Sequence, residues 1–325
     1  MTALRRAIPW LGPMALGLAL RLPGIATRPV WYDEAFSILL ASRPVRDILA
    51  GTAADTMPPA YYLALRVWMV AGSSILTLRT LNLILGVLLV GLVFLLARAA
   101  FDARAAPWAA LLAAISPLLV YHSQELRMYT LLATALCAYA YLLLGVIRNS
   151  DPRPPWLTWA GVVGAGVIAL YTHNLAVFSI VAPNVYLLIR RAWRTLASLL
   201  LAQAAMALLF LPWLVVVPGQ VAKIQAAFWT PRPGLLEIVQ GIVSSHAALP
   251  LPPAWTPLAV AAAVLAFVLT AYLVIRQGRS LEWTGYLITL AAVPPALLFL
   301  ASHVMRPLYV PRAYLLSLVV YLVLG

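Results

Sequence analysis

The sequence predicts an all-α, polytopic integral membrane protein. Hydrophobic residues make up 64% of the 325 residues and charged residues only 10%, whereas about a quarter of the residues of a soluble protein are charged. The apolar residues gather in repeated runs near the ~20 residues that a helix needs to cross a bilayer. The net charge of +13 comes almost entirely from Arg that flank these runs. No basic stripe or nucleic-acid motif accompanies it, so we expect no nucleic-acid partner.

About ten membrane-spanning helices are expected, because each needs ~20 apolar residues. They fall at residues 7–26, 75–97, 105–121, 128–147, 156–172, 174–189, 195–217, 257–275, 283–302 and from 312 onward. The last run stops at Gly325, short of a full span, so we expect the chain to be truncated within that helix. A single transmembrane domain over residues 1–325 accounts for this pattern.

Residues 27–74 form a long segment that is too interrupted by charge to cross a bilayer. Its 33–50 portion alternates apolar side chains with Arg43, Arg46 and Asp47, as in a helix that lies in the interface. A second interfacial helix should begin at residues 57–59, since proline suits the first helical turn. Residues 218–256 form a second such segment, for which we expect a part-helical lid or an acceptor-side loop.

The short connections between spans carry at least two Arg each, at 98/104, 148/153, 190/191/194 and 276/279. Arg-rich short loops are typical of the cytoplasmic side of a membrane. The segments 27–74 and 218–256 then lie on the outer face of the plasma (inner) membrane, on the periplasmic or extracellular side. The same face receives Asp33, Glu34, Asp55, Glu125 and all four histidines, His122, His173, His246 and His303.

Two polar clusters stand out on that face. Asp33 and Glu34 directly follow the first span, and acids at a membrane boundary indicate function, although a solvated loop also tolerates them. The second cluster occupies residues 116–129, where Pro117 should distort a helix end and Glu125 should fall in the first turn of the next helix. A carboxylate there suits the helix dipole. That capping role leaves the clustering of His122, Gln124, Arg127 and Tyr129 unexplained.

Five motifs occur in an order that resembles the GT-C glycosyltransferases. They are Asp33-Glu34, Asp55-Thr56-Met57-Pro58-Pro59-Ala60-Tyr61-Tyr62, the 116–129 stretch, Tyr171-Thr172-His173 and Pro311-Arg312-Ala313-Tyr314-Leu315-Leu316. Within that fold the chain is similar to the family of the protein O-mannosyltransferases and the lipid A aminoarabinose transferase (family 39-like). The resemblance covers nearly all of the chain.

The resemblance implies an inverting transfer of a sugar, mannose or a related hexose or pentose, from a polyprenyl-phosphate-linked donor. The acceptor would be a lipid, glycan or protein at the outer face of the membrane. The catalytic candidates that the resemblance implies are Asp33, which matches the family's catalytic base, and Glu34 beside it, which would orient interfacial groups. A carboxylate at this depth can accept the proton of an attacking hydroxyl while cationic groups hold the leaving phosphate.

Arg is suited to the leaving phosphate because its planar fork offers two donors at once. The candidates on the outer face are Arg127, Arg312, Arg306, His303 and Lys223. Each also fits a side chain that snorkels to the lipid headgroups, an alternative that weighs most for Arg306 and Lys223. Further residues expected to line the site are Asp55, Tyr61, His122, Glu125, Tyr129 and His173.

No set of metal ligands is evident, because His122 and Glu125 supply two ligands at most. We therefore predict no cofactor and no requirement for a divalent cation. Two other classes of protein remain open. A lipid or glycan transporter or flippase should show two related halves with polar residues near the bilayer midplane, and an assembly scaffold would not need Asp33 together with Glu125.

Overall fold

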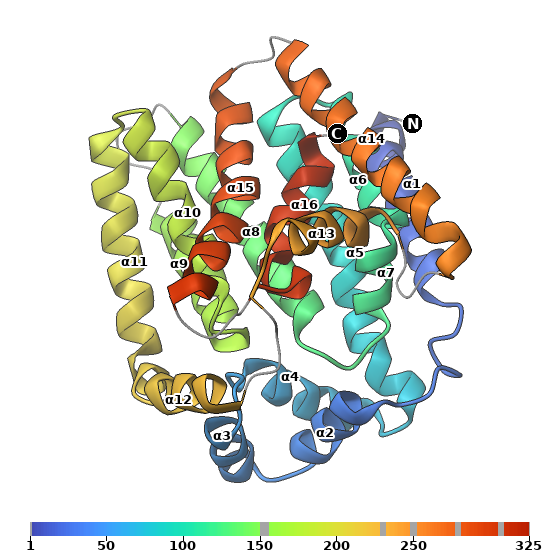
Figure 1. Cartoon of the computed structure of the whole chain (residues 1–325), viewed down its shortest axis with the longest axis vertical. Coiled ribbons are helices and arrows are strands. Elements are labelled where there is room, and N and C mark those ends of the chain that lie inside the picture. The colour runs from blue at the N-terminus through green and yellow to red at the C-terminus, as the bar shows by residue number, and fades with distance from the viewer. Residues whose placement is uncertain are drawn as a thin grey trace.

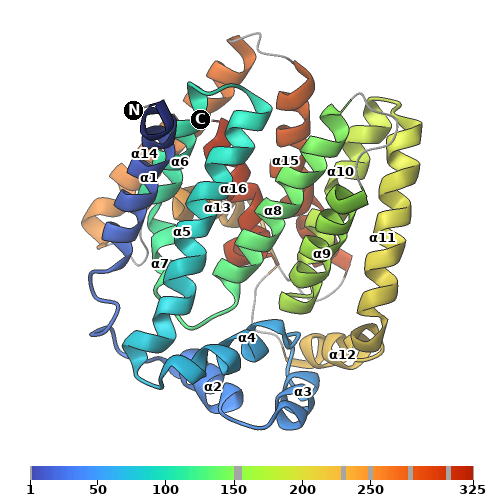
Figure 2. The same cartoon turned by 180° about the vertical axis from the view of Figure 1, so that it is seen from behind.

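The computed structural model describes residues 2–149, 156–227, 232–247, 252–276, 281–304 and 309–324, and these ranges contain helices and loops but no strand. Long helices form a bundle, and short helices cover one end of it (Figures 1 and 2). The bundle helices are α1 (Thr2–Arg21), α5 (Ile75–Ala100), α6 (Ala105–Ile115), α7 (Pro117–Ser123), α8 (Tyr129–Arg148), α9 (Trp156–Thr172), α10 (Ala176–Ile189), α11 (Trp193–Leu214), α14 (Thr256–Arg276), α15 (Leu281–Val304) and α16 (Leu315–Leu324).

These helices occupy every stretch that the apolar runs predict. Within the described residues, five are long and apolar enough to cross a bilayer, or six if the bent pair α6 and α7 forms one span. The helices α9, α10 and α16 are apolar but shorter. The predicted all-α membrane fold is confirmed, and the number of helices that cross alone is lower than the expected ten by this criterion.

Four short helices lie together at one end of the bundle, and we call them the platform (Figure 1). They are α2 (Tyr32–Ala41), α3 (Val45–Ala54), α4 (Ala60–Trp68) and α12 (Val217–Ala227). The first outer segment holds three helices where two were expected, followed by the short 3-10 helix η1 (Met69–Ala71). The predicted 33–50 helix is divided at Pro44, because proline has no N–H and disfavours helical geometry in the residue before it.

The ends of the bundle opposite the platform carry arginine residues. The helices α5 and α8 begin at the platform end and finish at the far end, where their last turns carry Arg98 and Arg148 (Figure 2). The platform and these arginines therefore lie at opposite ends of the molecule.

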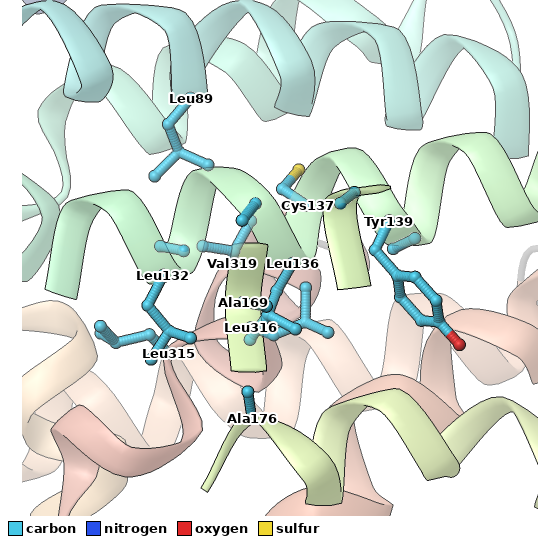
Figure 3. Close-up of a cluster of buried hydrophobic side chains, with 14 of the residues drawn as sticks. Leu89, Leu132, Leu136, Cys137, Tyr139, Ala169, Ala176, Leu315, Leu316 and Val319 are labelled. Carbon is cyan, nitrogen blue, oxygen red and sulfur yellow. The ribbon is translucent and has the colours of Figure 1, made fainter. Parts of the chain in front are cut away.

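The hydrophobic core is centred on α8, which packs against α5, α9 and α16. Figure 3 shows Leu132 and Leu136 of α8 with Leu89 of α5 and with Leu316 and Val319 of α16. Cys137 packs in this core as a buried free thiol.

The remaining described elements lie beside the C-terminal part of the bundle. They are α13 (Leu235–His246), η2 (Pro253–Trp255) and η3 (Pro311–Tyr314). The second outer segment is thus part-helical as expected, with α12 in the platform. Its residues 228–231 and 248–251 lie outside the described residues.

A 60° bend separates α6 from α7. Pro117 cannot donate to the carbonyl of Ala113, and Arg21 of α1 replaces that donor. The buried Arg21 guanidinium also donates to the carbonyl of Ala114 at 3.0 Å and to Ser123 Oγ at 3.1 Å. A side chain on Gly86 of α5 would overlap both Ser123 and Arg21, so glycine at this position permits the close approach.

Candidate active site

Asp33 lies in the first turn of α2, where the extended backbone at Trp31 lets the helix begin. Its carboxylate is 31% exposed and lies 3.6 Å from the guanidinium of Arg127. Arg127 belongs to the loop between α7 and α8, more than ninety positions further along the chain. The fold therefore joins the two polar clusters that follow separate spans.

Asp33 opens onto a cavity of about 270 Å³ between the platform and the bundle. The residues that line it come from both ends of the sequence: Tyr32, Asp33, Phe36, Asp55, Thr56, Met57, Arg127, Tyr129, His173, Asn174, Leu175, Ile224, Val310 and Arg312. Six of them, Asp33, Asp55, Arg127, Tyr129, His173 and Arg312, are candidates from the sequence. Asp55 stands at the C-terminal end of α3, and no ion pair of its carboxylate occurs among the described residues.

Two arginines from distant segments meet at the ring of Tyr129. The guanidinium carbon of Arg127 lies 5.9 Å from the ring centroid, and that of Arg312 lies 5.7 Å from it. Burial opposes the charge of Arg127, but Tyr62, Tyr129 and Asp33 raise its pKa, so the side chain stays cationic. Its buried Nε has no hydrogen-bond partner in the described structure. Two such forks on one wall are suited to an anion such as phosphate.

His173 is held as a neutral donor at the same cavity. Its Nδ1 accepts a hydrogen bond from the backbone N–H of Leu175 at 3.2 Å, so the proton of the neutral ring is on Nε2. Burial, together with the charges of Arg127 and Arg312, lowers the pKa of His173 to about 4. The ring is therefore uncharged near neutral pH and can donate one hydrogen bond.

Glu34, the second catalytic candidate from the sequence, does not line the cavity. It is buried, and its carboxylate pairs with Arg79 of α5 at 2.7 Å. The carboxylate also accepts the backbone N–H of Leu126 at 2.8 Å. Arg79 donates in turn to the carbonyls of Ile25 and Arg28. The Glu34–Arg79 pair thus fixes α2, which carries Asp33, against α5 and the loop that carries Arg127.

Glu125 lies in the α7–α8 loop instead of the first turn of α8, because that helix starts only at Tyr129. Its carboxylate is buried and bonds His122 Nδ1 at 2.6 Å. Asn82 of α5 holds this loop in place, because its amide donates to the carbonyls of Glu125 and Arg127. His122 and Glu125 therefore support the cavity wall without lining the cavity.

Three further candidates from the sequence also lie off the cavity. Tyr61 of α4 is buried in the hydrophobic core. His303 is exposed at the end of α15, where its Nδ1 contacts the carbonyl of Phe299. Lys223 of α12 donates to the carbonyl of Ala54 and holds α12 against α3. Arg306 falls at residues 305–308, outside the described residues.

A polar junction at the cavity rim was not anticipated. The Asn174 amide donates to the carbonyl of Thr56 at 3.1 Å and to Gln220 Oε1 at 2.8 Å. Gln220 donates to the carbonyl of Thr52 at 2.9 Å, so the junction ties the α9–α10 loop to α3 and α12. Asn174 adjoins His173 in a motif noted above, which is a usable signal. Ile224 and Val310 carry no such signal in the sequence.

The described residues contain no cluster of three or more His, Cys, Asp or Glu side chains that could hold a metal ion. The polar groups that meet at the cavity are instead a carboxylate with its arginine, a second carboxylate, a second arginine and a neutral histidine. The two arginines can bind an anion, and a neighbouring carboxylate can accept a proton.

Comparison with known proteins agrees with the resemblance noted in the sequence. Residues 55–216 match the family described as dolichyl-phosphate-mannose-protein mannosyltransferase. No curated protein is significantly similar in sequence over the chain.

Solved structures share the fold at low sequence identity. ArnT from Cupriavidus metallidurans in the apo state is 17% identical with a TM-score of 0.68, and the match covers 100% of this chain and 59% of ArnT. ArnT bound to undecaprenyl phosphate is 15% identical with a TM-score of 0.70, and the match covers 97% of this chain and 58% of ArnT. A third structure is the oligosaccharyltransferase AglB from Archaeoglobus fulgidus in complex with an inhibitory peptide and a dolichol-phosphate. It is 15% identical with a TM-score of 0.60, and the match covers 97% of this chain and 49% of AglB.

The chain thus spans between 49% and 59% of the length of these proteins. The match at residues 55–216 and the shared fold confirm the resemblance noted in the sequence. The chain therefore has the GT-C fold of these solved structures, and its residues 55–216 are similar to the family described as dolichyl-phosphate-mannose-protein mannosyltransferase.

Proposed function

We propose that the protein transfers a sugar from a polyprenyl-phosphate-linked donor to an acceptor hydroxyl, with Asp33 as general base and inversion at the anomeric carbon. The observation that carries this proposal is the convergence of Asp33, Arg127 and Arg312 on one cavity. The cavity would open at the outer face of the plasma membrane, where a lipid-linked donor and a polar acceptor can meet.

In the reaction, the donor phosphate lies between Arg127 and Arg312, and the Nε2–H of His173 donates to an oxygen nearby. The acceptor oxygen attacks the anomeric carbon as the bond from that carbon to the phosphate oxygen breaks. Asp33 takes the acceptor proton, and the polyprenyl phosphate leaves as an anion held by the two guanidinium groups. Because one displacement occurs, the configuration at the anomeric carbon inverts.

The donor sugar in this proposal is a single hexose or pentose, such as mannose. A cavity of about 270 Å³ is slightly smaller than ordinary ligand pockets, which run from roughly 300 to 1,000 Å³, so it suits a small group. The ArnT structure with undecaprenyl phosphate and the AglB structure with dolichol-phosphate support a lipid-phosphate donor. The proposed displacement uses only side chains of this protein and calls for no cofactor.

The test is sugar transfer by the purified protein in proteoliposomes that contain a radiolabelled polyprenyl-phosphate mannose. Asp33→Asn keeps the shape of the side chain and removes the basic oxygen, so turnover should fall about 10²–10⁴-fold while the Kd of the donor changes little. Asp102→Asn is the matched control, because Asp102 lies in the α5–α6 connection at the other end of the bundle. It should leave turnover unchanged.

Two results would contradict the proposal. Wild-type rates from Asp33→Asn would show that the carboxylate is structural. Movement of the donor across the bilayer without formation of a glycoside would assign the protein to the flippases.

A further inference from the structure

Asp55 is the acid of the cavity that the proposed mechanism leaves unused. It directly follows the last residue of α3 and lines the same cavity as Asp33. The carboxylate of Asp33 lies 3.6 Å from the Arg127 guanidinium. Within the described part of the chain, the carboxylate of Asp55 has neither an ion pair nor a hydrogen bond to another side chain. Its charge is therefore available to a ligand.

The position of Asp55 on α3 does not serve the stability of that helix. Carboxylates stabilise the first turn of a helix, whereas at the C-terminal end they meet the negative end of the helix dipole. Asp47 occupies the favourable place in the first turn, and Asp55 occupies the unfavourable one at the other end. Helix capping therefore does not account for the carboxylate of Asp55.

The backbone around Asp55 is held by side chains of α12 and of the α9–α10 loop. These side chains donate hydrogen bonds to three nearby carbonyls. The donor and acceptor residues are Gln220 and Thr52, Lys223 and Ala54, and Asn174 and Thr56. The backbone N–H of Asp55 is also used, because it bonds the carbonyls of Gly51 and Thr52. The carboxylate thus stands on a fixed backbone, and a preorganised group loses little conformational freedom when it binds a ligand.

The polar groups that line the cavity divide into donors and acceptors. Arg127 and Arg312 have donors only, and the neutral ring of His173 presents its Nε2–H. Asp55 supplies two acceptor oxygens. Asn174 also lines the cavity, and its buried Oδ1 has no hydrogen-bond partner in the described structure. Donors suit the phosphate of the donor molecule, and acceptors suit the hydroxyl groups of the sugar attached to it.

The charges beside the cavity decide which kind of sugar fits. Among the described residues, Asp33 and Asp55 supply two negative charges, and the donor phosphate adds a third. Arg127 and Arg312 supply two positive charges, and Lys223, which donates to the carbonyl of the residue before Asp55, supplies a third. The site is therefore balanced when the sugar itself is uncharged. Such a sugar offers hydroxyl groups to Asp55, not an ammonium group.

We propose that Asp55 is a specificity-determining residue whose carboxylate accepts hydrogen bonds from hydroxyl groups of the donor sugar. The proposal rests on the proposed function and deepens it by naming the group that selects the sugar. The two carboxylate oxygens can accept two neighbouring hydroxyls at once. A sugar that lacks these hydroxyls leaves the carboxylate without a partner in a confined site, so it is rejected.

The experiment measures donor binding to the full chain in nanodiscs, which requires no knowledge of the acceptor. Radiolabelled polyprenyl-phosphate mannose is displaced by four kinds of unlabelled competitor. These are the same donor, analogues that each lack one sugar hydroxyl, analogues that carry an amino group in its place, and polyprenyl phosphate without a sugar. Asp55→Ala is the test variant. Asp47→Ala is the matched control, because Asp47 lies on the same helix, exposed and outside the cavity.

We expect the wild type to bind the mannosyl donor about 10–10²-fold more tightly than at least one deoxy analogue, as for the loss of a hydrogen bond to a charged group. Asp55→Ala should bind the two equally. The Kd of sugar-free polyprenyl phosphate should not rise in this variant, since the arginines are untouched and a negative charge has been removed. Asp47→Ala should discriminate as the wild type does.

Thermal unfolding separates this role from a structural one. Asp55→Ala removes an acid from the C-terminal end of α3, so its Tm should equal or exceed that of the wild type. A large fall in Tm would assign the carboxylate to the fold and overturn the proposal.

Discrimination that persists in Asp55→Ala, or equal binding of the mannosyl donor and every deoxy analogue by the wild type, would also overturn it. Tighter binding of an amino analogue than of the mannosyl donor would assign Asp55 to a cationic sugar instead. In all these cases the wild type still binds the lipid phosphate, so the proposed function stands. Failure of the wild type to bind either polyprenyl phosphate or the mannosyl donor would remove the proposed function, and the role of Asp55 with it.

Discussion

Asp33 and Glu34 show how neighbouring carboxylates on one helix acquire different chemistry. Successive helical residues point about 100° apart, so Asp33 faces the cavity while Glu34 faces α5. Asp33 keeps 31% of its side chain exposed and Glu34 only 1%. The exposed acid can exchange a proton with a ligand, and the buried acid is committed to Arg79.

At this scale we predict that Glu34→Gln destabilises the fold. The change leaves the buried guanidinium of Arg79 without its carboxylate, and breaking such a pair typically costs about 3–5 kcal/mol. Asp33→Asn is the control, because its partner Arg127 lies at 3.6 Å and the carboxylate is partly solvated. Thermal unfolding in detergent should give a much lower Tm for Glu34→Gln than for Asp33→Asn. Equal Tm values would mean that the Glu34–Arg79 pair contributes little.

The bend between α6 and α7 decides where the next loop lies. By turning through 60°, the chain delivers residues 124–128 to the platform end, where Arg127 meets Asp33. Arg21 satisfies the carbonyls of Ala113 and Ala114 that face the bend. Arg21 of α1 therefore helps to fix the bend between α6 and α7, although Ser123 of α7 follows it by 102 positions.

For this element we predict that Arg21→Met loosens the bend. The substitution leaves buried carbonyl oxygens unpaired, at a cost of about 1–3 kcal/mol. Hydrogen exchange followed by mass spectrometry should show faster exchange of backbone amides in residues 117–128. Arg98→Met, which changes an exposed arginine of α5, is the control and should leave that exchange unchanged. Unaltered protection in Arg21→Met would show that the proline alone fixes the bend.

At the scale of the molecule, the platform lies at one end of the bundle, and the last turns of α5 and α8, with Arg98 and Arg148, lie at the other (Figures 1 and 2). Arginine in short connections is typical of the cytoplasmic side, so the platform should lie outside. The orientation of the whole molecule thus decides which compartment the candidate site faces.

Cysteine labelling in intact cells tests this orientation. Cys137 is buried and is the sole cysteine of the sequence, so Cys137→Ala gives a clean background. In that background Arg46→Cys on the platform should react with a membrane-impermeant maleimide in intact cells. Arg98→Cys at the far end should react only after permeabilisation. The reverse pattern would place the platform in the cytoplasm.

The apolar runs predict the helices well, because burial in lipid demands long uninterrupted apolar segments whatever the packing. The sequence also identifies Arg127 and Arg312 as candidates for one site, and the structure places both on one cavity. Details that depend on packing were less accessible. The sequence predicts one helix across Pro44, whereas the structure has two. It also predicts Glu125 in the first turn of the next helix, whereas that helix starts four positions later, at Tyr129.

Arg79 shows what the sequence could have revealed. It stands inside an apolar run, where a charge is costly unless it has a partner. The rule identifies such a residue but not its partner, because Glu34 lies 45 positions away. The Asn174–Gln220 junction is harder still to predict, since neutral amides carry no comparable signal.

The spread of the cavity lining along the chain, from Tyr32 to Arg312, has a consequence for biosynthesis. A membrane protein enters the bilayer from its N-terminus as the ribosome extends it, so Asp33 and Arg127 reach their places long before Arg312 exists. Throughout that interval the carboxylate and its first arginine stand beside an unfinished wall. The cavity is therefore complete only after Arg312 has been synthesised, and no nascent chain that ends before Arg312 can possess it.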